Sequence, residues 1–175
     1  MNIKTAIKDK IPYSFLGILQ KIKMFGYSNG ITKGKHCYID KSAQFIGKSC
    51  IQLGNNVCIG MDVNININGP RNDKIKRLII GSNSYVGRDS FISTGKLITL
   101  GEFFLGGPHC SIIGQNHDVS NPLKSYLVGE AELTKTIVIE DNVWIGDGVT
   151  VVGNLTIGRG SIIGAKSLVT NKMSA

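Results

Sequence analysis

The chain has 175 residues, 42% hydrophobic and 18% charged, which suits one globular domain with a core. With 22 glycines and 4 prolines, collagen and low-complexity linkers are excluded and many tight turns are favoured. No apolar run reaches the roughly 18 residues of a membrane-spanning helix. The four cysteines form no CxxC pair, so we expect reduced, buried thiols and a cytoplasmic protein.

The formal net charge of +8 is concentrated at the N-terminus. Residues 1–35 hold seven lysines and one aspartate, whereas the remaining 140 residues hold 13 basic and 11 acidic side chains. A nucleic-acid-binding protein usually spreads a basic patch, interleaved with aromatic residues, over its fold. The near-neutral main body therefore argues against a nucleic-acid partner.

Residues 1–35 are predicted to form a basic amphipathic leader. Apolar residues occur at 3, 7, 11, 15, 16, 19 and 22, and Pro12 divides them, which predicts two short amphipathic helices with lysines outside. Two interpretations remain open. The leader packs on the following domain as a cap, or residues 1–24 make a peripheral contact with an anionic membrane surface.

Residues 36–175 are predicted to form a second unit in which apolar residues recur every six positions. The sets are 39/45/51, 53/59/65, 80/86/92, 100/106/112 and 139/145/151/157/163/169, with Gly106 as the non-apolar member. Neither the 3.6-residue period of a helix nor the two-residue period of a strand gives this spacing. Three six-residue sides close an 18-residue triangular coil whose apolar residues stack on neighbouring coils. We therefore predict an all-β fold, a parallel β-helix of about six coils, rather than a sandwich.

Two segments fit no hexad: residues 68–77 ("NGPRNDKIKR") and residues 117–136 ("HDVSNPLKSYLVGEAELTKT"). Each follows the third side of a coil and precedes a new coil, so both are expected to leave the prism at one corner, two coils apart. Long polar loops within a repeat fold are usually functional. The corner is therefore the predicted active site, and His117 stands where the coil gives way to the second loop.

The segment "IEDNVWIGDGVTVVGNLTIGRGSIIGAKSLVT" (residues 139–170), together with the loop histidine, resembles the hexapeptide-repeat acyltransferases. The resemblance is to the sugar and polysaccharide O-acetyltransferase branch, which includes maltose and galactoside acetyltransferases, and it covers residues 36–173. It implies a left-handed helix, a homotrimer with sites between subunits, and acetyl-CoA as co-substrate without a metal. The implied reaction acetylates a hydroxyl of a sugar or glycan precursor.

The resemblance also implies roles for individual residues near the loop. His117 corresponds to the catalytic base, and imidazole suits the removal of a hydroxyl proton near neutral pH. Ser93 stands where the family has an asparagine that contacts the substrate and the reacting acyl group, and Thr94 is a nearby substitute of similar chemistry. Asp118 and His109 are candidate substrate contacts. The alternatives are a turn-capping role for His117 and a surface or subunit-interface role for His109.

The implied coenzyme contacts lie in the last coils, at Trp144, Asp147, Ala165 and Thr170. Asp147 departs from the small polar residue usual there, and Lys166 is expected to compensate by attracting phosphates. Trp144 is alternatively a wall residue between coils. Family members also continue past the "VTN" segment, so we expect either a missing final segment or an incomplete coenzyme site.

Several other functions are compatible with the sequence. The acceptor is alternatively an amino sugar, acetylated on nitrogen, or the hydroxyl of an antibiotic. Metal-dependent β-helix carbonic anhydrases share the fold but need three converging histidines, and His36 is remote from His109 and His117 in coil order. The non-enzyme alternative is a β-helix that serves as a scaffold.

Overall fold

The computed structural model describes residues 29–67, 74–117, 121, 123, 125, 131, 132 and 135–174. The predicted helices of the leader and Asp118 therefore lie outside the described residues. Within the described ranges, no helix is long and apolar enough to cross a membrane.

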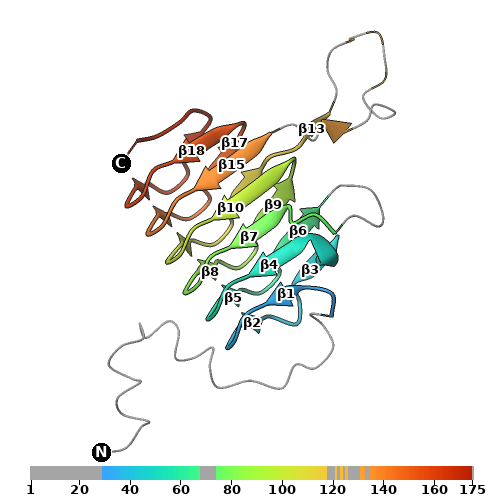
Figure 1. Cartoon of the computed structure of the whole chain (residues 1–175). Coiled ribbons are helices and arrows are strands. Elements are labelled where there is room, and N and C mark those ends of the chain that lie inside the picture. Colours follow the sequence, from blue (N-terminus) through green and yellow to red (C-terminus); the bar gives the residue numbers. More distant parts are fainter. Residues whose placement is uncertain are drawn as a thin grey trace, which may run out of the picture.

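Three parallel six-stranded sheets form the three sides of a triangular prism (Figure 1). The first sheet contains β1 (Thr32–Lys33), β4 (Ile51–Leu53), β7 (Leu78–Ile80), β10 (Leu97–Leu100), β15 (Thr136–Ile139) and β18 (Leu155–Ile157). The second contains β2 (Tyr38–Ile39), β5 (Cys58–Ile59), β8 (Tyr85–Val86), β11 (Leu105–Gly106), β16 (Trp144–Ile145) and β19 (Ile162–Ile163). The third contains β3 (Gln44–Ile46), β6 (Asn64–Ile67), β9 (Phe91–Thr94), β12 (Ser111–Ile113), β17 (Thr150–Val152) and β20 (Leu168–Val169).

Each coil places one strand in every sheet, so the described residues make six coils, as the hexad pattern predicts. The first coil begins with β1, which pairs with β4 in the first sheet and so lies ahead of the boundary expected at residue 36. A short 3-10 helix, η1 (Lys48–Cys50), connects the first coil to the second.

The predicted inward positions form the core. From Ile139 to Val169 all six residues at the six-residue spacing are buried. In the set 100/106/112, Gly106 has no side chain to bury, and the ring of Phe104 occupies this space. A Cβ on Gly106 would lie 3.1 Å from a ring atom of Phe104, which is only 2% exposed. The stacked aliphatic side chains therefore hold the coils together, since a single coil buries little by itself.

Asparagines form the corner between the first and second sheets. Asn56, Asn83 and Asn142 occupy equivalent positions with φ between 55° and 60°, in the left-handed region that asparagine tolerates better than most residues. The Asn56 side-chain amide also donates a hydrogen bond to Asn83 Oδ1 at 2.9 Å. Phe103 holds the equivalent position between Asn83 and Asn142 with φ 56°, so the turn geometry recurs without a continuous row of asparagines.

The register of the first sheet shows where extra residues enter. An ideal coil has 18 residues, and Ile139 pairs with Ile157 at that spacing. The offsets elsewhere are 20 (Lys33 to Leu53), 27 (Leu53 to Ile80), 20 (Ile80 to Leu100) and 39 (Leu100 to Ile139). All four insertions fall between a strand of the third sheet and the next strand of the first sheet. We call this edge the insertion corner.

Candidate active site

Hydrogen bonds tie the four insertions of the insertion corner together. Lys76 Nζ donates to Thr32 Oγ1 at 2.7 Å and to the carbonyl of Ser49 at 2.8 Å, which links the end of the first loop to the first coil and to η1. The N–H of Lys96 donates to the carbonyl of Lys135 at 2.9 Å, which links the third insertion to the end of the second loop. The corner is therefore a connected surface rather than four separate turns.

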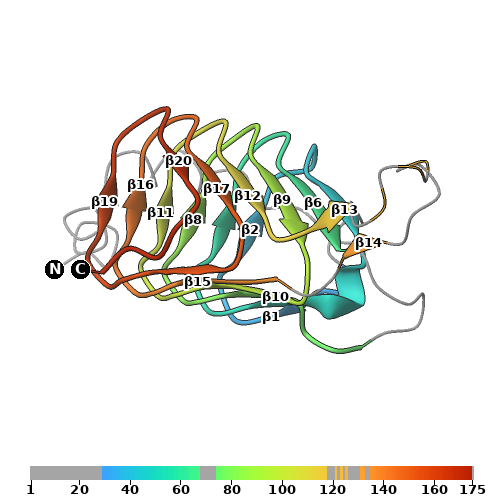
Figure 2. The same cartoon turned by 90° about the horizontal axis from the view of Figure 1, so that it is seen from above.

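His117 lies at this corner, at the start of the second loop. It ends β13 (Asn116–His117), which pairs antiparallel with β14 (Ala131–Glu132), so that Asn116 lies opposite Glu132 and His117 opposite Ala131. Figure 2 shows β13 and β14 at the same edge of the prism as the helical turn of η1. The two ends of the loop thus close into a short ladder, which gives the exposed His117 an ordered base.

Ser93 and Thr94 lie one coil below, at the end of β9. Ser93 is 6% exposed, and its hydroxyl donates to Gln115 Oε1 at 3.2 Å. Thr94 is fully buried, and neither its Oγ1 nor Asn66 Oδ1 has a hydrogen-bond partner among the described residues. Asn66 pairs with Ser93 across the third sheet, so polar side chains continue down this side of the corner.

His109 lies at a different corner from His117. It occupies the turn between the second and third sheets with φ 56°, and its Nδ1 is 3.9 Å from Asp89 Oδ2. The strand β12 separates the two histidines along the same coil. The structure therefore brings Ser93 and Thr94, but not His109, to the His117 corner within one chain.

The predicted coenzyme residues gather mainly at the corner between the second and third sheets. Trp144, 49% exposed, projects from the outer face of the second sheet. Asp147 and Lys166 occupy the following turn on successive coils, with Lys166 Nζ 3.9 Å from Asp147 Oδ1. The N–H of Lys166 donates to the carbonyl of Asp147, which fixes the exposed turn that contains Ala165.

Thr170 lies apart from this group. It follows β20 and lines an open hollow of about 320 Å³ at the last coil, together with Leu168, Asn171 and Lys172. The coenzyme group and His117 thus lie at opposite ends of the strands of the third sheet. An elongated ligand along this sheet, or a neighbouring subunit, would be needed to bring them together.

A cluster of titratable groups lies outside the candidate site, on the outer face of the second sheet. Partial burial alone would raise the pKa of Asp40, but hydrogen bonds from Ser42 and Tyr38 outweigh it and lower that pKa.

Burial raises the pKa of the Cys58 thiol to about 12, so this thiol stays protonated at neutral pH. Cys50, Cys58 and Cys110 are buried as predicted, whereas Cys37 is half-buried, and none of the four forms a disulfide.

Metal ligands do not converge in the described part of the chain: no three His, Cys, Asp or Glu side chains come together there. His36, on the first coil, lies three coils from His109 in the order of the sheets.

Sequence reasoning missed Gln115, Asn66 and the pairing of β13 with β14. Gln115 is two residues before His117, and in an extended chain such residues point to the same side, so its position alone was a usable signal. Asn66 follows an inward isoleucine in a strand, which marks it as facing outward at the corner. The pairing of β13 with β14 has no comparable signal, because only two residues on each side take part.

The three-sided coil is built on a six-residue repeat, and part of the chain matches a known repeat family. Residues 136–171 match the family described as bacterial transferase hexapeptide (six repeats). The fold is the left-handed parallel β-helix of its acyltransferase neighbours. One is AntD, an N-acyltransferase from Bacillus cereus solved with dTDP-4-amino-4,6-dideoxyglucose and coenzyme A. It has a TM-score of 0.68 and 21% identity, over 83% of this chain and 76% of that chain.

Another solved neighbour is a hexapeptide-repeat-containing acetyltransferase from Vibrio cholerae O1 biovar eltor, complexed with acetyl coenzyme A. Its TM-score is 0.56 at 26% identity, over 67% of this chain and 59% of that chain. In sequence, the chain is 30% identical to the galactoside O-acetyltransferase of Lactococcus lactis subsp. lactis over 131 residues, which are 75% of this chain and 59% of the relative.

The Escherichia coli galactoside O-acetyltransferase is 34% identical over 96 residues, which are 51% of this chain and 46% of the relative. The chain therefore spans about half of the length of the curated relatives that it matches. Over the matched residues, the chain is similar to acetyltransferases with hexapeptide repeats.

Proposed function

We propose that the protein is an acetyl-CoA-dependent O-acetyltransferase that acetylates a hydroxyl of a sugar or glycan precursor. The observation that carries the proposal is the position of His117, exposed at an ordered strand pair on the insertion corner of a fold shared with acyltransferases. Similarity to two galactoside O-acetyltransferases favours a hydroxyl acceptor.

In the proposed reaction, the His117 imidazole takes the proton of the acceptor hydroxyl as its oxygen attacks the thioester carbonyl carbon. The tetrahedral intermediate then expels the thiolate of coenzyme A and leaves an acetyl ester on the acceptor. The His117 imidazolium gives its proton to the thiolate. The corner supplies polar groups for the developing oxyanion, with Ser93 and Thr94 as the candidates. Asp118 and His109 remain proposed acceptor contacts, His109 from a neighbouring subunit because it lies at another corner.

The proposed coenzyme contacts are Trp144, Asp147, Ala165, Lys166 and Thr170. The exposed Trp144 ring provides a flat apolar surface, and the turn of Ala165 exposes backbone close to it on the next coil. The Lys166 ammonium lies near the carboxylate of Asp147, so phosphate binding here would have to compete with that carboxylate. We propose that the reaction takes place in the cytoplasm, where acetyl-CoA is available. We also propose that it belongs to polysaccharide biosynthesis.

We further propose a homotrimer with the sites between subunits. The outer face of the second sheet supports it, because Leu105, Trp144 and Ile162 form a continuous row of exposed apolar side chains on successive coils. Such rows on a soluble protein usually mark an interface. Covering this row would bring a second subunit next to the proposed coenzyme residues.

The proposal is tested by replacing His117 with alanine and with glutamine. Transfer is measured as release of the coenzyme A thiol in the presence of a panel of galactosides. The expected result is a loss of roughly 10²–10⁴-fold in kcat, the range usual for a general base, with acetyl-CoA affinity within about twofold of wild type.

His36→Asn is the matched control, since asparagine tolerates the left-handed backbone at this exposed position. It should leave the rate unchanged. Transfer that survives the loss of the His117 imidazole would contradict the proposed role.

A further inference from the structure

Charge is segregated within the main body of the chain. The four insertion segments, residues 47–50, 68–77, 94–97 and 114–136, together contain eight basic and four acidic residues, a net charge of +4. The rest of residues 29–175, which includes Lys33 and Lys35 of the first coil, contains seven basic and seven acidic residues, a net charge of zero. Among the described residues, the excess of positive charge therefore lies in the insertion segments, and the rest of the prism is neutral.

The described cations of the insertion corner form a row along the prism, which we call the basic ridge: Lys48, Lys74, Lys76, Arg77, Lys96 and Lys135. Lys76 Nζ reaches the carbonyls of Ser49 and Ile51, and Arg77 Nη1 reaches the carbonyl of Lys96 at 3.5 Å. Lys96 is in turn hydrogen-bonded through its N–H to Lys135. These contacts hold the cations of four insertions on one edge.

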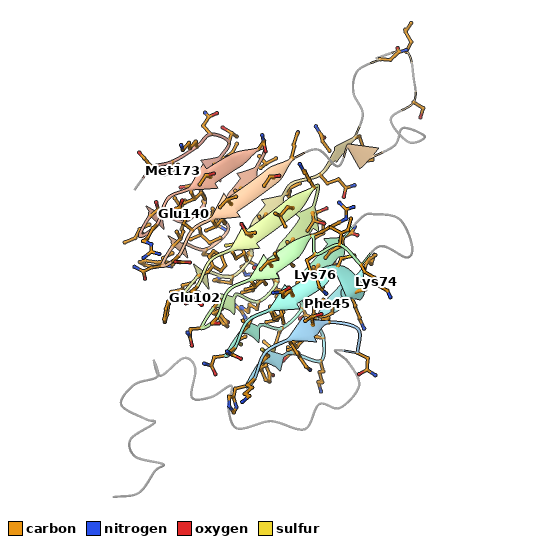
Figure 3. The ribbon with its side chains drawn as sticks, in the orientation of Figure 1. Phe45, Lys74, Lys76, Glu102, Glu140 and Met173 are labelled. Atoms are coloured by element: carbon orange, nitrogen blue, oxygen red, sulfur yellow. The ribbon has the colours of Figure 1, made fainter. Side chains whose placement is uncertain are left out.

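Several acidic side chains lie at the corner between the first and second sheets. Figure 3 shows Lys74 and Lys76 on one side of the prism and Glu102 and Glu140 on the other. Glu102 and Glu140 belong to the corner between the first and second sheets, where Asp141 also lies and forms an ion pair with Arg159. The excess of positive charge therefore attracts anions to the insertion corner.

His117 belongs to the same corner as the ridge. The strand that it ends is tied to Ser93 through Gln115, and Lys96 follows Ser93 by three residues on the same turn. An acceptor that presents a hydroxyl to His117 therefore lies in the field of the ridge. Lys74 and Lys96 are both exposed, so their ammonium groups are accessible to such a ligand.

We infer that the acceptor is anionic: a sugar that carries a phosphate or carboxylate group, held by the basic ridge while its hydroxyl faces His117. This inference rests on the proposed function and narrows its substrate class. Lysine and arginine bind phosphate and carboxylate oxygens through charge-assisted hydrogen bonds, which are about twice as strong as neutral ones. A neutral sugar could accept hydrogen bonds from these cations but would gain no ion pairing with them.

Coenzyme A also carries phosphates, but four of the residues proposed to bind it, Trp144, Asp147, Ala165 and Lys166, lie away from the ridge. Thr170 follows β20 and lies at the corner of the ridge, but on the last coil. The ridge extends from the first coil to Lys135 at the start of the fifth, whereas Trp144, Asp147 and Lys166 lie on the last two coils at another corner. The acceptor and the coenzyme are therefore expected to respond to different charge changes.

The first test needs no turnover. Inorganic pyrophosphate is titrated into the protein while the imidazole NMR signals are recorded; the chain has three histidines, assigned with His36→Asn and His117→Gln. We expect a saturable shift of the His117 signal that disappears in the double variant Lys74→Glu/Lys96→Glu. It should persist in Lys35→Glu/Lys41→Glu, which makes the same change in net charge at the other two corners. Absence of a shift in wild type, or its persistence in the ridge variant, overturns the inference.

The second test compares galactose 1-phosphate with methyl galactoside as acceptors in the thiol-release assay. The phosphorylated sugar should have a kcat/KM about tenfold higher at low ionic strength, and salt and the ridge variant should each reduce this preference. Equal or better use of the neutral sugar overturns the inference. If neither sugar is acetylated while pyrophosphate still binds at the ridge, the proposed function fails and the anion site stands.

Coenzyme affinity separates the two sources of phosphate. Acetyl-CoA should bind the ridge variant Lys74→Glu/Lys96→Glu as tightly as wild type. A tenfold loss of acetyl-CoA affinity in this variant would assign the ridge to the coenzyme and overturn the inference.

Discussion

Asp40 is a residue whose ionisation is coupled to folding. Its carboxylate accepts hydrogen bonds from the N–H and hydroxyl of Ser42 and from the Tyr38 hydroxyl, which together lower its pKa despite partial burial. A carboxyl with a lower pKa in the folded state stabilises the fold above its unfolded pKa, near 3.9, and loses this contribution as pH falls through the folded pKa.

We therefore predict that Asp40→Ala lowers the melting temperature by about 2–4 °C at pH 7. The difference from wild type should shrink as the pH is lowered below about 4, followed by circular dichroism. Asp40→Asn is the control, because it can still accept hydrogen bonds from Ser42 but carries no charge. A difference between wild type and Asp40→Ala that is the same at pH 7 and pH 3 would contradict the coupling.

Residue-level chemistry was only partly accessible from the sequence. His117 could be selected because it stands where the hexad pattern stops, and Trp144 because it follows an inward valine. The bond between Ser93 and Gln115 could not be predicted, because it joins side chains 22 positions apart across a corner whose geometry depends on two-residue insertions. Similarly, nothing local to Phe104 shows that its ring fills the space above Gly106.

Among the connecting elements, the end of the first loop is fixed by one side chain. Lys76 Nζ donates to Thr32 Oγ1 and to the carbonyls of Ser49 and Ile51. It thus joins the first coil, η1 and the second coil at the end of the prism where fewer coils stack.

Lys76→Met keeps most of the side-chain length but removes all three donors. We predict a loss of about 1 kcal/mol in the free energy of unfolding, measured by urea denaturation, and faster amide exchange at Gly34 and Tyr38 in the first coil. Lys74→Met, an exposed neighbour, is the control and should have no measurable effect on either. Unchanged exchange in the first coil of Lys76→Met would show that Lys76 does not hold the first coil.

Strand positions followed from the sequence because each inward aliphatic residue must stack on an equivalent residue of the next coil. The hexad sets restart two residues late at Leu53 and Leu100, and the structure explains both delays by short insertions at one corner. The β13–β14 pair was not predictable, since its strands lack the apolar repeat that marks the others.

For the whole molecule, the fold follows almost entirely from the period of six, because coil size, sheet number and loop placement all derive from it. Charge segregation does not appear in the overall composition, since it depends on which corner each segment occupies. The relation between His117 and the coenzyme residues also could not be read from the sequence. These groups lie at opposite ends of the third sheet, and their approach is expected to involve a second subunit.

The measurement that tests this account most directly is calorimetric titration of acetyl-CoA into the purified protein, with the mass of the assembly determined on the same sample. We predict saturable binding of about one acetyl-CoA per subunit to a trimer, and weaker binding when Trp144, at the proposed interface, is replaced by alanine. Two results would contradict the proposal of an acetyltransferase with sites between subunits. One is a folded protein that binds no acetyl-CoA, and the other is a monomer that binds acetyl-CoA saturably at about one per subunit.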